Sequence, residues 1–362
     1  MTQSATILPP KQSQQRDKYW DALRGVAIFA VIVIHACGSA LGTQPEVFGF
    51  SNFSSGLVIR QLMAFAVPLF LFISGYWMRN VRIASAADYV DFLRKRAAKI
   101  LIPYLTWSCI YSVFSAMASH TVPSLQAILT ALATGSAAAP FYFILLIMQF
   151  YMLLPILQFI MQRLRIGLAI IIIVNLACLL VIYYLRIVRH SDIPFILLAG
   201  PCCNWILYFC LGLMADRIRL RVSTALLVVG VIASFLLALG ESQYLLSLTG
   251  IIGFSTSTIR LGSLLYSVSI ILLGLSLNRS NASSVRLWVL VGRYSFGIYF
   301  VHMLMLNIAD HGLRKITLLY ALQPAYIVLL ALITLVASYG IIAISRRLLP
   351  RELLKTVLAF GT

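Results

Sequence analysis

The feature that most restricts the fold is a series of apolar runs, each about twenty residues long, that recurs along the whole chain. A helix of about twenty apolar residues is long enough to cross the ~30 Å hydrocarbon core of a bilayer. The sequence therefore predicts an all-α, polytopic integral membrane protein with about ten transmembrane helices. The ten runs lie at 20–41, 57–78, 98–119, 141–161, 167–185, 195–214, 223–239, 261–277, 288–308 and 323–346.

Composition agrees with this class, because 61% of the residues are hydrophobic and only 10% are charged. In soluble domains about 25% of the residues are charged. The assignment of two segments stays open. Because 244–257 is also apolar, the seventh and eighth spans are the least certain, and the short Ala-rich stretch 125–139 is either a re-entrant or a surface segment.

The chain shows no soluble domain, linker or internal repeat. We therefore expect one membrane domain over 16–350, with a disordered cytoplasmic tail at 1–15 and a cytoplasmic C-terminal tail at 351–362. The six cysteines lack CxxC spacing and are interpreted as small buried hydrophobic residues. A disulfide near Cys202 and Cys203 stays open, and no metal site is expected.

Lysine and arginine are distributed unevenly between alternate loops. They gather in the N-terminal flank, in the loop at 79–99, in later even-numbered loops and near the C-terminus, whereas 41–56 and 120–140 contain none. Because cytoplasmic loops carry the excess of Lys and Arg, both termini are predicted to be cytoplasmic. The same pattern explains most of the +18 net charge without nucleic acid, since a DNA binder gathers its basic residues on a soluble face.

The first apolar run places two polar residues on one helical face. Arg24 and His35 are eleven positions apart, so an α-helix rises ~16 Å between them and returns to within ~20° of the same direction. Arg24 alone is an ordinary interface anchor, and His35 alone is explained by a hydrogen bond between helices. Polar residues inside a membrane nevertheless indicate function by default. Asp21, one turn before Arg24, is spaced to pair with it.

Two of the five histidines, His35 and His302, lie within predicted spans. His302 follows Arg293 by nine residues, a rise of ~13 Å, which brings it to a depth near that of His35. Histidine suits proton transfer because its unperturbed pKa is ~6.5. A general base is therefore one interpretation of this pair.

The loop before the third run has a helix-start signature and a cluster of cations. Ser85 and Asp88 match a capping box. The cations of 94–99 suit a polyphosphate ligand through charge-assisted hydrogen bonds, and they equally suit anionic lipid head groups. In FLFISGY, Ser74 and Gly75 mark a close approach to another helix or to a ligand. The aromatic residues that begin 141–155 are interpreted as an interface belt.

Taken in order, these stretches resemble the acyltransferase-3 family of bacterial integral-membrane O-acyltransferases. The resemblance covers about 16–350, and its strength lies in the ordered set together with the Arg24-x10-His35 spacing. The pieces are DALRG at 21–25, FLFISGY at 70–76, FLRKRAAKILIPY at 92–104, FYFILLIMQFYMLLP at 141–155 and GRYSFGIYFVH at 292–302.

The resemblance implies about ten helices in a bacterial cytoplasmic (inner) membrane and transfer of an acyl group, usually acetyl, from cytosolic acyl-CoA to a saccharide hydroxyl. It also implies importance for Arg24 and His35 and for the basic pair Arg96 and Lys99. Members more often have arginine at the second position of that pair, which weakens a bidentate phosphate clamp here. Many members have His-Leu-Trp-Phe where this chain reads PFYF at 140–143. Some carry a C-terminal soluble esterase-like domain, which is not expected here.

The resulting hypothesis is a membrane O-acyltransferase that uses acetyl-CoA or another acyl-CoA as donor. Its partners would be a saccharide or lipid-linked glycan acceptor and membrane lipids, with no nucleic acid. Both direct transfer with a histidine general base and an acyl-histidine intermediate stay open. The candidate catalytic residues are His35, Arg24, His302 and Ser74, and the candidate acyl-CoA-binding residues are Arg96, Lys99, Arg94 and Arg24.

A secondary transporter or flippase is the main alternative, because ten helices would be ordinary for that class. Proton-driven transporters often use in-membrane Asp or Glu, whereas here all acidic residues are expected in loops or at helix ends. Paired broken helices, which mark repeat symmetry in transporters, are also not seen. A scaffold protein gives no reason for two buried histidines. The acidic residues are Asp17, Asp21, Glu46, Asp88, Asp91, Asp192, Asp216, Glu241, Asp310 and Glu352.

Overall fold

The computed structural model describes residues 18–41, 55–191, 193–277, 286–316 and 322–361. Within these ranges the chain is built from helices without strands. The predicted N-terminal tail, 1–15, lies outside the described residues. The α-helices are α1 Lys18–Leu41, α2 Ser55–Leu62, α3 Ala66–Met78, α4 Ala86–Ser119, α5 Leu125–Thr134, α6 Tyr142–Ile160, α7 Leu164–Tyr183, α8 Phe195–Ala199, α9 Ile206–Leu213, α10 Thr224–Thr249, α11 Ile252–Ser255, α12 Leu261–Ser276, α13 Arg286–Arg293, α14 Ser295–Leu313, α16 Gln323–Leu348 and α17 Arg351–Thr356.

Seven helical segments of the described chain are long and apolar enough to cross a membrane, and there are eight if α13 and α14 count as one bent span. This confirms an all-α, multi-pass membrane protein; the count of about ten spans and the cytoplasmic termini stay predictions. The seven are Lys18–Gly38, Ser55–Met78, Ala86–Ser119, Ala139–Ile160, Leu164–Val188, Thr224–Thr249 and Gln323–Leu348.

The other three predicted runs fold differently from single straight spans. The run 195–214 is divided into α8, a 3₁₀ turn at Cys202–Asn204 and α9. The run 261–277 corresponds to α12, which has 16 residues. The run 288–308 bends by 81° between α13 and α14. The bend between α13 and α14 places Arg293 and Ser295 in the lining of the cavity described below.

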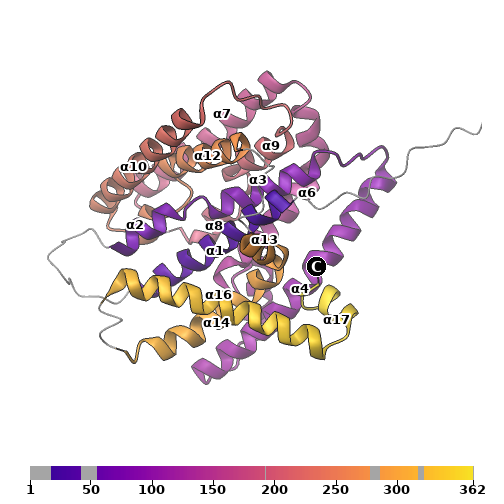
Figure 1. Ribbon diagram of the computed structural model, residues 1–362, viewed down its shortest axis with the longest axis vertical. Coiled ribbons are helices and arrows are strands. Elements are labelled where there is room, and N and C mark those ends of the chain that lie inside the picture. The colour runs from indigo at the N-terminus through magenta and orange to yellow at the C-terminus, as the bar shows by residue number, and fades with distance from the viewer. Residues whose placement is uncertain (1–17, 42–54, 192, 278–285, 317–321, 362) are drawn as a thin grey trace, which may run out of the picture.

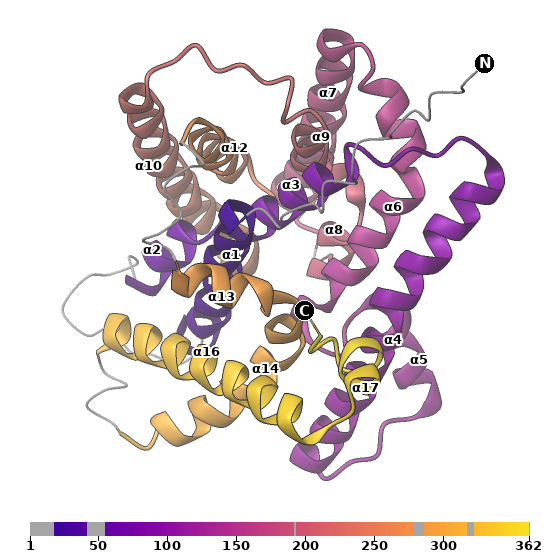
Figure 2. The same ribbon diagram turned by 45° about the vertical axis from the view of Figure 1, so that its right-hand side comes forward.

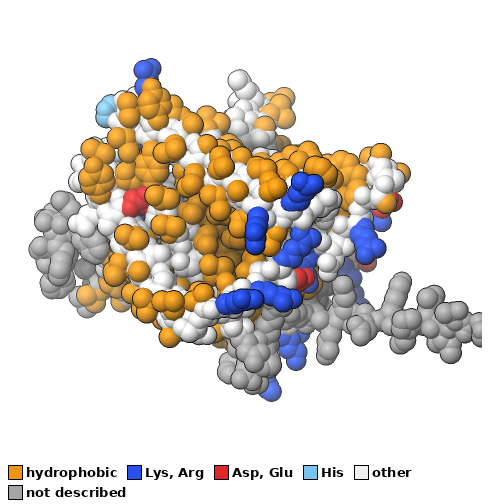
Figure 3. Space-filling view, turned by 90° about the horizontal axis from the view of Figure 1, so that it is seen from above, with side chains coloured by type: hydrophobic (Ala, Val, Ile, Leu, Met, Phe, Trp, Pro, Cys, Tyr) orange, Lys and Arg blue, Asp and Glu red, His pale blue; other side chains and the backbone are white. Residues whose placement is uncertain are grey.

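Helix α1 lies at the centre of the bundle and is surrounded by α3, α13, α14 and α16 (Figures 1 and 2). Its contact with α13 requires glycine, because a Cβ atom on Gly292 would lie 1.7 Å from the carbonyl oxygen of Asp21. Side chains that face outward are largely apolar, for example Ile173 at 66% and Leu180 at 69% exposure. Figure 3 shows one such face, where Lys and Arg gather on one side of a mainly hydrophobic surface. This distribution fits a lipid-facing exterior with a basic border.

Gly75, beside Ser74, forms a second close contact, between α3 and α9. A Cβ atom on Gly75 would lie 2.1 Å from the carbonyl oxygen of Phe209, and one on Gly212 would lie 2.1 Å from that of Phe72. Small residues allow membrane helices to approach this closely. The packing interpretation of Gly75 is therefore confirmed.

Replacing Gly75 with alanine is expected to destabilise the protein by about 1–3 kcal/mol, the usual cost of overpacking a well-packed contact. Thermal unfolding of the detergent-solubilised protein measures this effect. Gly230→Ala is the matched control, because a Cβ atom there meets nothing within 4 Å. Equal unfolding midpoints for the two variants would show that the α3–α9 contact is not tight.

The residues after α16 pack into the bundle. Phe360 is 2% exposed, and its ring centroid lies 5.9 Å from that of Trp107 on α4. The Trp107 indole N–H donates a hydrogen bond to the Leu358 carbonyl at 3.3 Å. In Figure 2, α17 lies against α4. Within the segment 351–362, Leu354, Ala359 and Phe360 are therefore packed against the bundle.

Three local predictions have definite outcomes. Within the stretch 125–139, α5 covers Leu125–Thr134 and has no buried residue. All six cysteines are free; Cys37 and Cys210 are buried as predicted, but Cys109 is exposed on α4. The placement of every acidic residue in loops or at helix ends is wrong for Glu241, because α10 continues to Thr249 and encloses it.

Candidate functional site

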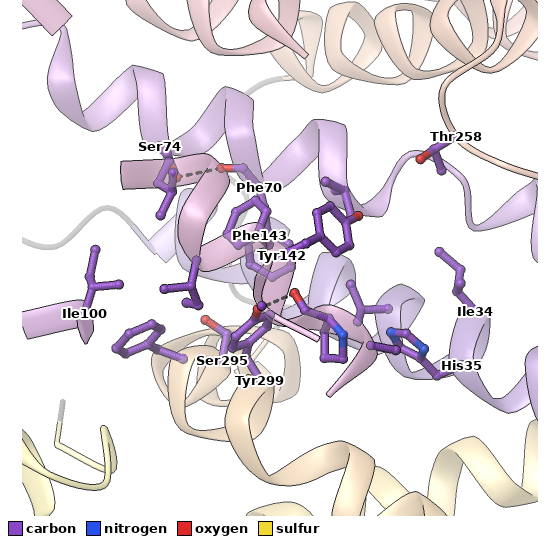
Figure 4. A pocket seen from close by; sticks show the side chains of 18 of the residues that line it. Ile34, His35, Phe70, Ser74, Ile100, Tyr142, Phe143, Thr258, Ser295 and Tyr299 are labelled. Carbon is purple, nitrogen blue, oxygen red and sulfur yellow. Dashed lines mark hydrogen bonds between the residues drawn. The ribbon is translucent and has the colours of Figure 1, made fainter. Parts of the chain in front are cut away.

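A cavity of about 780 Å³ brings together side chains from α1, α2, α3, α4, α6, α13 and α14. This volume is typical of small-molecule and cofactor sites. Five residues proposed from the sequence line it: Arg24, His35, Ser74, Arg96 and Lys99. Figure 4 shows Ile34 and His35 at one end of the cavity and Ile100 at the other, with Ser74, Tyr142 and Tyr299 between them.

One end of the cavity is strongly basic. Arg24, Arg96, Lys99 and Arg293 line this part, which we call the basic end. Lys99 is exposed and Arg96 is half-buried, so the basic end meets the protein surface. No carboxylate is found among the described residues that line the cavity. Such a charge distribution favours an anionic ligand.

The start of α4 determines which cations face the cavity. The Ser85 hydroxyl accepts a hydrogen bond from the Asp88 N–H at 3.1 Å, and the Asp88 carboxylate accepts one from the Ser85 N–H at 3.0 Å. This confirms the predicted capping box and fixes the helix register. Arg96 and Lys99 are three residues apart and therefore share a face. Arg94 is exposed and does not line the cavity.

Asp21 holds two of the cations of the basic end. Its carboxylate lies 3.9 Å from Arg24 Nη1 and 3.9 Å from Arg293 Nε, and its side chain is fully buried. The predicted pairing with Arg24 is therefore confirmed, and Arg293 is an additional partner. Arg96 lies over the rings of Phe92 and Tyr151, with its Cζ 5.5 and 5.6 Å from their centroids. Aromatic contacts of this kind orient a guanidinium without neutralising it.

His35 lies deeper in the cavity, beside His302. The two ring centroids are 5.5 Å apart. His302 is completely buried and is not among the lining residues, so it lies behind the cavity wall rather than on it. Ser74 lines the cavity, but its hydroxyl donates a hydrogen bond to the Phe70 carbonyl at 2.8 Å.

The hydrogen bonds of His302 fix its tautomer. Nδ1 lies 2.7 Å from the Tyr299 carbonyl oxygen and 3.2 Å from that of Ile298. Because a carbonyl can only accept, Nδ1 carries the hydrogen, and Nε2 of the neutral ring is then an acceptor. Nε2 is buried and has no hydrogen-bond partner in the described chain. It is thus available to accept a hydrogen bond from the His35 ring.

Several lining residues were not identified as site residues from the sequence. Arg60 could have been, because an arginine inside a predicted span is a functional signal. Tyr142 was missed because its stretch was interpreted as an interface belt; that interpretation is wrong, since Phe141 is 0% and Tyr142 8% exposed. Tyr299 gave no signal, because its position depends on a 2.5 Å hydrogen bond from its hydroxyl to the Pro140 carbonyl.

Glu241 does not belong to this cavity. Its carboxylate accepts hydrogen bonds from Arg260 at 3.1 Å and from the Gly262 N–H at 2.9 Å, and a third from the Tyr183 hydroxyl. This carboxylate accepts hydrogen bonds from three donors, one of which is the cation Arg260, and it therefore joins α10 to the start of α12. It provides no support for a proton relay of the transporter type.

Comparisons with known proteins agree with the resemblance found in the sequence. A family model described as an acyltransferase domain matches residues 17–343. In Bacillus subtilis (strain 168), the protein named "Putative membrane-bound acyltransferase YfiQ" is 25% identical over 355 residues, which cover 92% of this chain and 96% of that protein. No solved structure matches the chain.

Proposed function

Because the chain belongs to the acyltransferase-3 family and is therefore a membrane acyltransferase, we propose that it moves an acyl group, preferably acetyl, from cytosolic acyl-CoA to a hydroxyl group. The acceptor would be a cell-surface or lipid-linked saccharide. The observation that carries this proposal is that the cations of the basic end and His35 line the same cavity.

The separation of Arg24 and His35 along α1 suits an acyl-CoA donor. The phosphates would bind at the basic end, where charge-assisted hydrogen bonds from Arg96, Lys99 and Arg24 are available. The eleven residues between Arg24 and His35 correspond to ~16 Å along α1. An extended thiol-bearing arm would cross this distance and present the thioester to His35.

His35 would act on the acceptor at the thioester. As a general base, it would take the proton of the acceptor hydroxyl while the hydroxyl oxygen attacks the thioester carbon. The C–S bond then breaks, and the imidazolium returns the proton to the departing thiolate. In the covalent alternative the imidazole itself attacks the thioester carbon, the C–S bond breaks, and CoA leaves as the thiol with the proton that the ring loses. The acceptor hydroxyl then attacks the acyl-imidazole, the C–N bond breaks, and the hydroxyl proton returns to the ring.

His302 is proposed as a positioning residue for His35. Its Nδ1–H is held by backbone carbonyls, so its Nε2 can accept a hydrogen bond from one nitrogen of His35. That bond would leave the other His35 nitrogen as the acceptor facing the cavity. Orientation of a catalytic imidazole by a hydrogen bond to its second nitrogen is a general feature of histidine catalysis.

The function is tested on cells and on the purified protein. Deletion of the gene should remove acetyl groups from a glycan fraction of the cells. Mass spectrometry of glycans from deletion and wild-type cells measures this loss. The purified protein in detergent should release CoA from labelled acetyl-CoA and transfer the label to that glycan fraction. Unchanged glycans together with no release of CoA would contradict the proposal.

Arg96→Ala and Lys99→Ala are each expected to raise the KM for acyl-CoA by roughly ten- to a hundredfold. Each removes a charge-assisted hydrogen bond worth about 1.5–3 kcal/mol, and about 1.4 kcal/mol corresponds to tenfold in affinity. Steady-state kinetics of CoA release measure the change. Lys95→Ala is the matched control, because Lys95 is exposed on the same helix and pairs with Asp91 at 2.6 Å. A KM that responds equally to all three substitutions would argue against a specific phosphate site.

A further inference from the structure

A fifth cation, Arg60, lies at the end of the cavity opposite the basic end. It is on α2 and lines the cavity together with His35 and Gly38. Its Nη1 lies 3.9 Å from the position that a Cβ atom on Gly38 would occupy. Gly38 is about one helical turn beyond His35 in the direction away from Arg24. Along α1 the order is therefore the basic end, His35 and then Arg60.

The Arg60 guanidinium has no hydrogen bond or ion pair with any other residue in the described ranges. The buried acidic groups are engaged elsewhere: Asp21 with Arg24 and Arg293, and Glu241 with Arg260. A cation in a membrane interior is costly unless it is paired or used. The planar fork of arginine matches carboxylate and phosphate oxygens in a bidentate geometry.

The two residues that follow Arg60 in the chain hold α2 in place. Gln61, adjacent to Arg60, is fully buried and accepts a hydrogen bond from Arg260 at 2.6 Å. The Tyr266 hydroxyl donates one to the Leu62 carbonyl at 2.9 Å. Because these two contacts hold the adjacent turn, the direction of Arg60 into the cavity is set by the bundle. A preorganised cation of this kind binds an anion without first paying for its own ordering.

We propose that Arg60 is the anion-binding residue of the acceptor site, and that the acceptor carries a carboxylate or phosphate group close to the hydroxyl that is acylated. The proposal rests on the proposed function, because the hydroxyl must meet His35. The donor phosphates do not suit Arg60, since they occupy the basic end on the other side of His35. An anionic acceptor held at Arg60 and a donor held at the basic end place the two reacting groups at His35 from opposite sides.

Two pairs of small probes test the proposal on the detergent-solubilised full chain with acetyl-CoA present. Methyl glucuronide against methyl glucoside tests a carboxylate, and glycerol 3-phosphate against glycerol tests a phosphate. Binding is measured as the shift of the thermal unfolding midpoint over a probe titration. In the wild-type protein we expect at least one charged probe to bind ten times or more tightly than its neutral partner, and the preference to weaken with salt. A preference within the glucuronide pair would indicate a carboxylate on the acceptor, and a preference within the glycerol pair would indicate a phosphate.

The variants make the result specific to Arg60. Arg60→Gln should remove the preference for the charged probe, Arg60→Lys should keep part of it, and Arg165→Gln should behave as wild type, because Arg165 is an exposed cation outside the cavity. Absence of any charge preference in the wild-type protein, or its persistence in Arg60→Gln, would overturn the proposal. CoA release from acetyl-CoA without probe is measured on the same wild-type sample. Its absence would count against the proposed function, whereas its presence without a charge preference would count against the anion site alone.

Discussion

His35→Ala is expected to lower the rate of acyl transfer by roughly 10²–10⁴-fold, the usual contribution of a positioned general base. The His35 imidazole lies between the basic end and Arg60, and His35 is the histidine among the described residues that line the cavity. The substitution removes it but leaves the cations of the basic end in place. We therefore expect the KM for acyl-CoA to change much less than kcat. Steady-state CoA release and label transfer by the purified protein measure both constants.

The control for this substitution is His311→Ala, because His311 is exposed near the end of α14 and lies outside the cavity. Near-normal transfer by His35→Ala would remove the central residue of the mechanism. The wild-type protein also separates the two chemical routes. Label that stays on the protein after acetyl-CoA is removed, and is absent from His35→Ala, indicates the acyl-histidine route.

Arg260→Ala is expected to give the largest loss of stability, about 3–5 kcal/mol, because it removes one partner of a buried ion pair. The Arg260 side chain is fully buried, and its Nη1 lies 3.1 Å from the Glu241 carboxylate. It also donates hydrogen bonds to Gln61 at 2.6 Å and to Ser263 at 3.1 Å. The substitution would leave Glu241 without its cation and remove the hydrogen bond that joins the start of α12 to Gln61 on α2. Thermal unfolding in detergent measures the loss.

The double variant Arg260→Met with Glu241→Gln separates charge from packing. Since both charges are absent, it should be more stable than Arg260→Met alone, which keeps a side chain of similar volume but leaves the Glu241 carboxylate without its cation. The cost is then mainly that of the unpaired carboxylate. If the double variant is as unstable as the sum of its single substitutions, the pair has no coupling and its role is only to fill space.

The bend between α13 and α14 is a feature that the sequence did not predict. The mainly apolar run 288–308 has the length of a single helix, but it bends by 81° between α13 and α14. Hydropathy measures the length of an apolar segment and carries no information on its direction. The bend allows Gly292 to contact α1 and places Arg293 beside Asp21. Arg293 is therefore part of the cavity wall.

His302 and Arg60 illustrate the same limit for the site. The rings of His302 and His35 lie 5.5 Å apart, although the rise counted from Arg293 assumed one straight helix and the chain bends after that residue. The helical spacing could not predict that His302 lies behind the cavity wall and that its Nδ1 is hydrogen-bonded to backbone carbonyls. Arg60 lies within a predicted span, but its lack of a partner in the described chain became visible only when the surrounding helices were placed.

The sequence by itself determined the class of this protein, because apolar runs of membrane-spanning length permit few other solutions. It also determined that Arg24 and His35 share a face and that Arg96 and Lys99 share another, since these relations depend only on helical periodicity. The tertiary structure decided which faces meet. Close glycine contacts such as Gly292 against α1 set the distances between helices. Those distances bring five cations and one imidazole of the described residues around a common cavity.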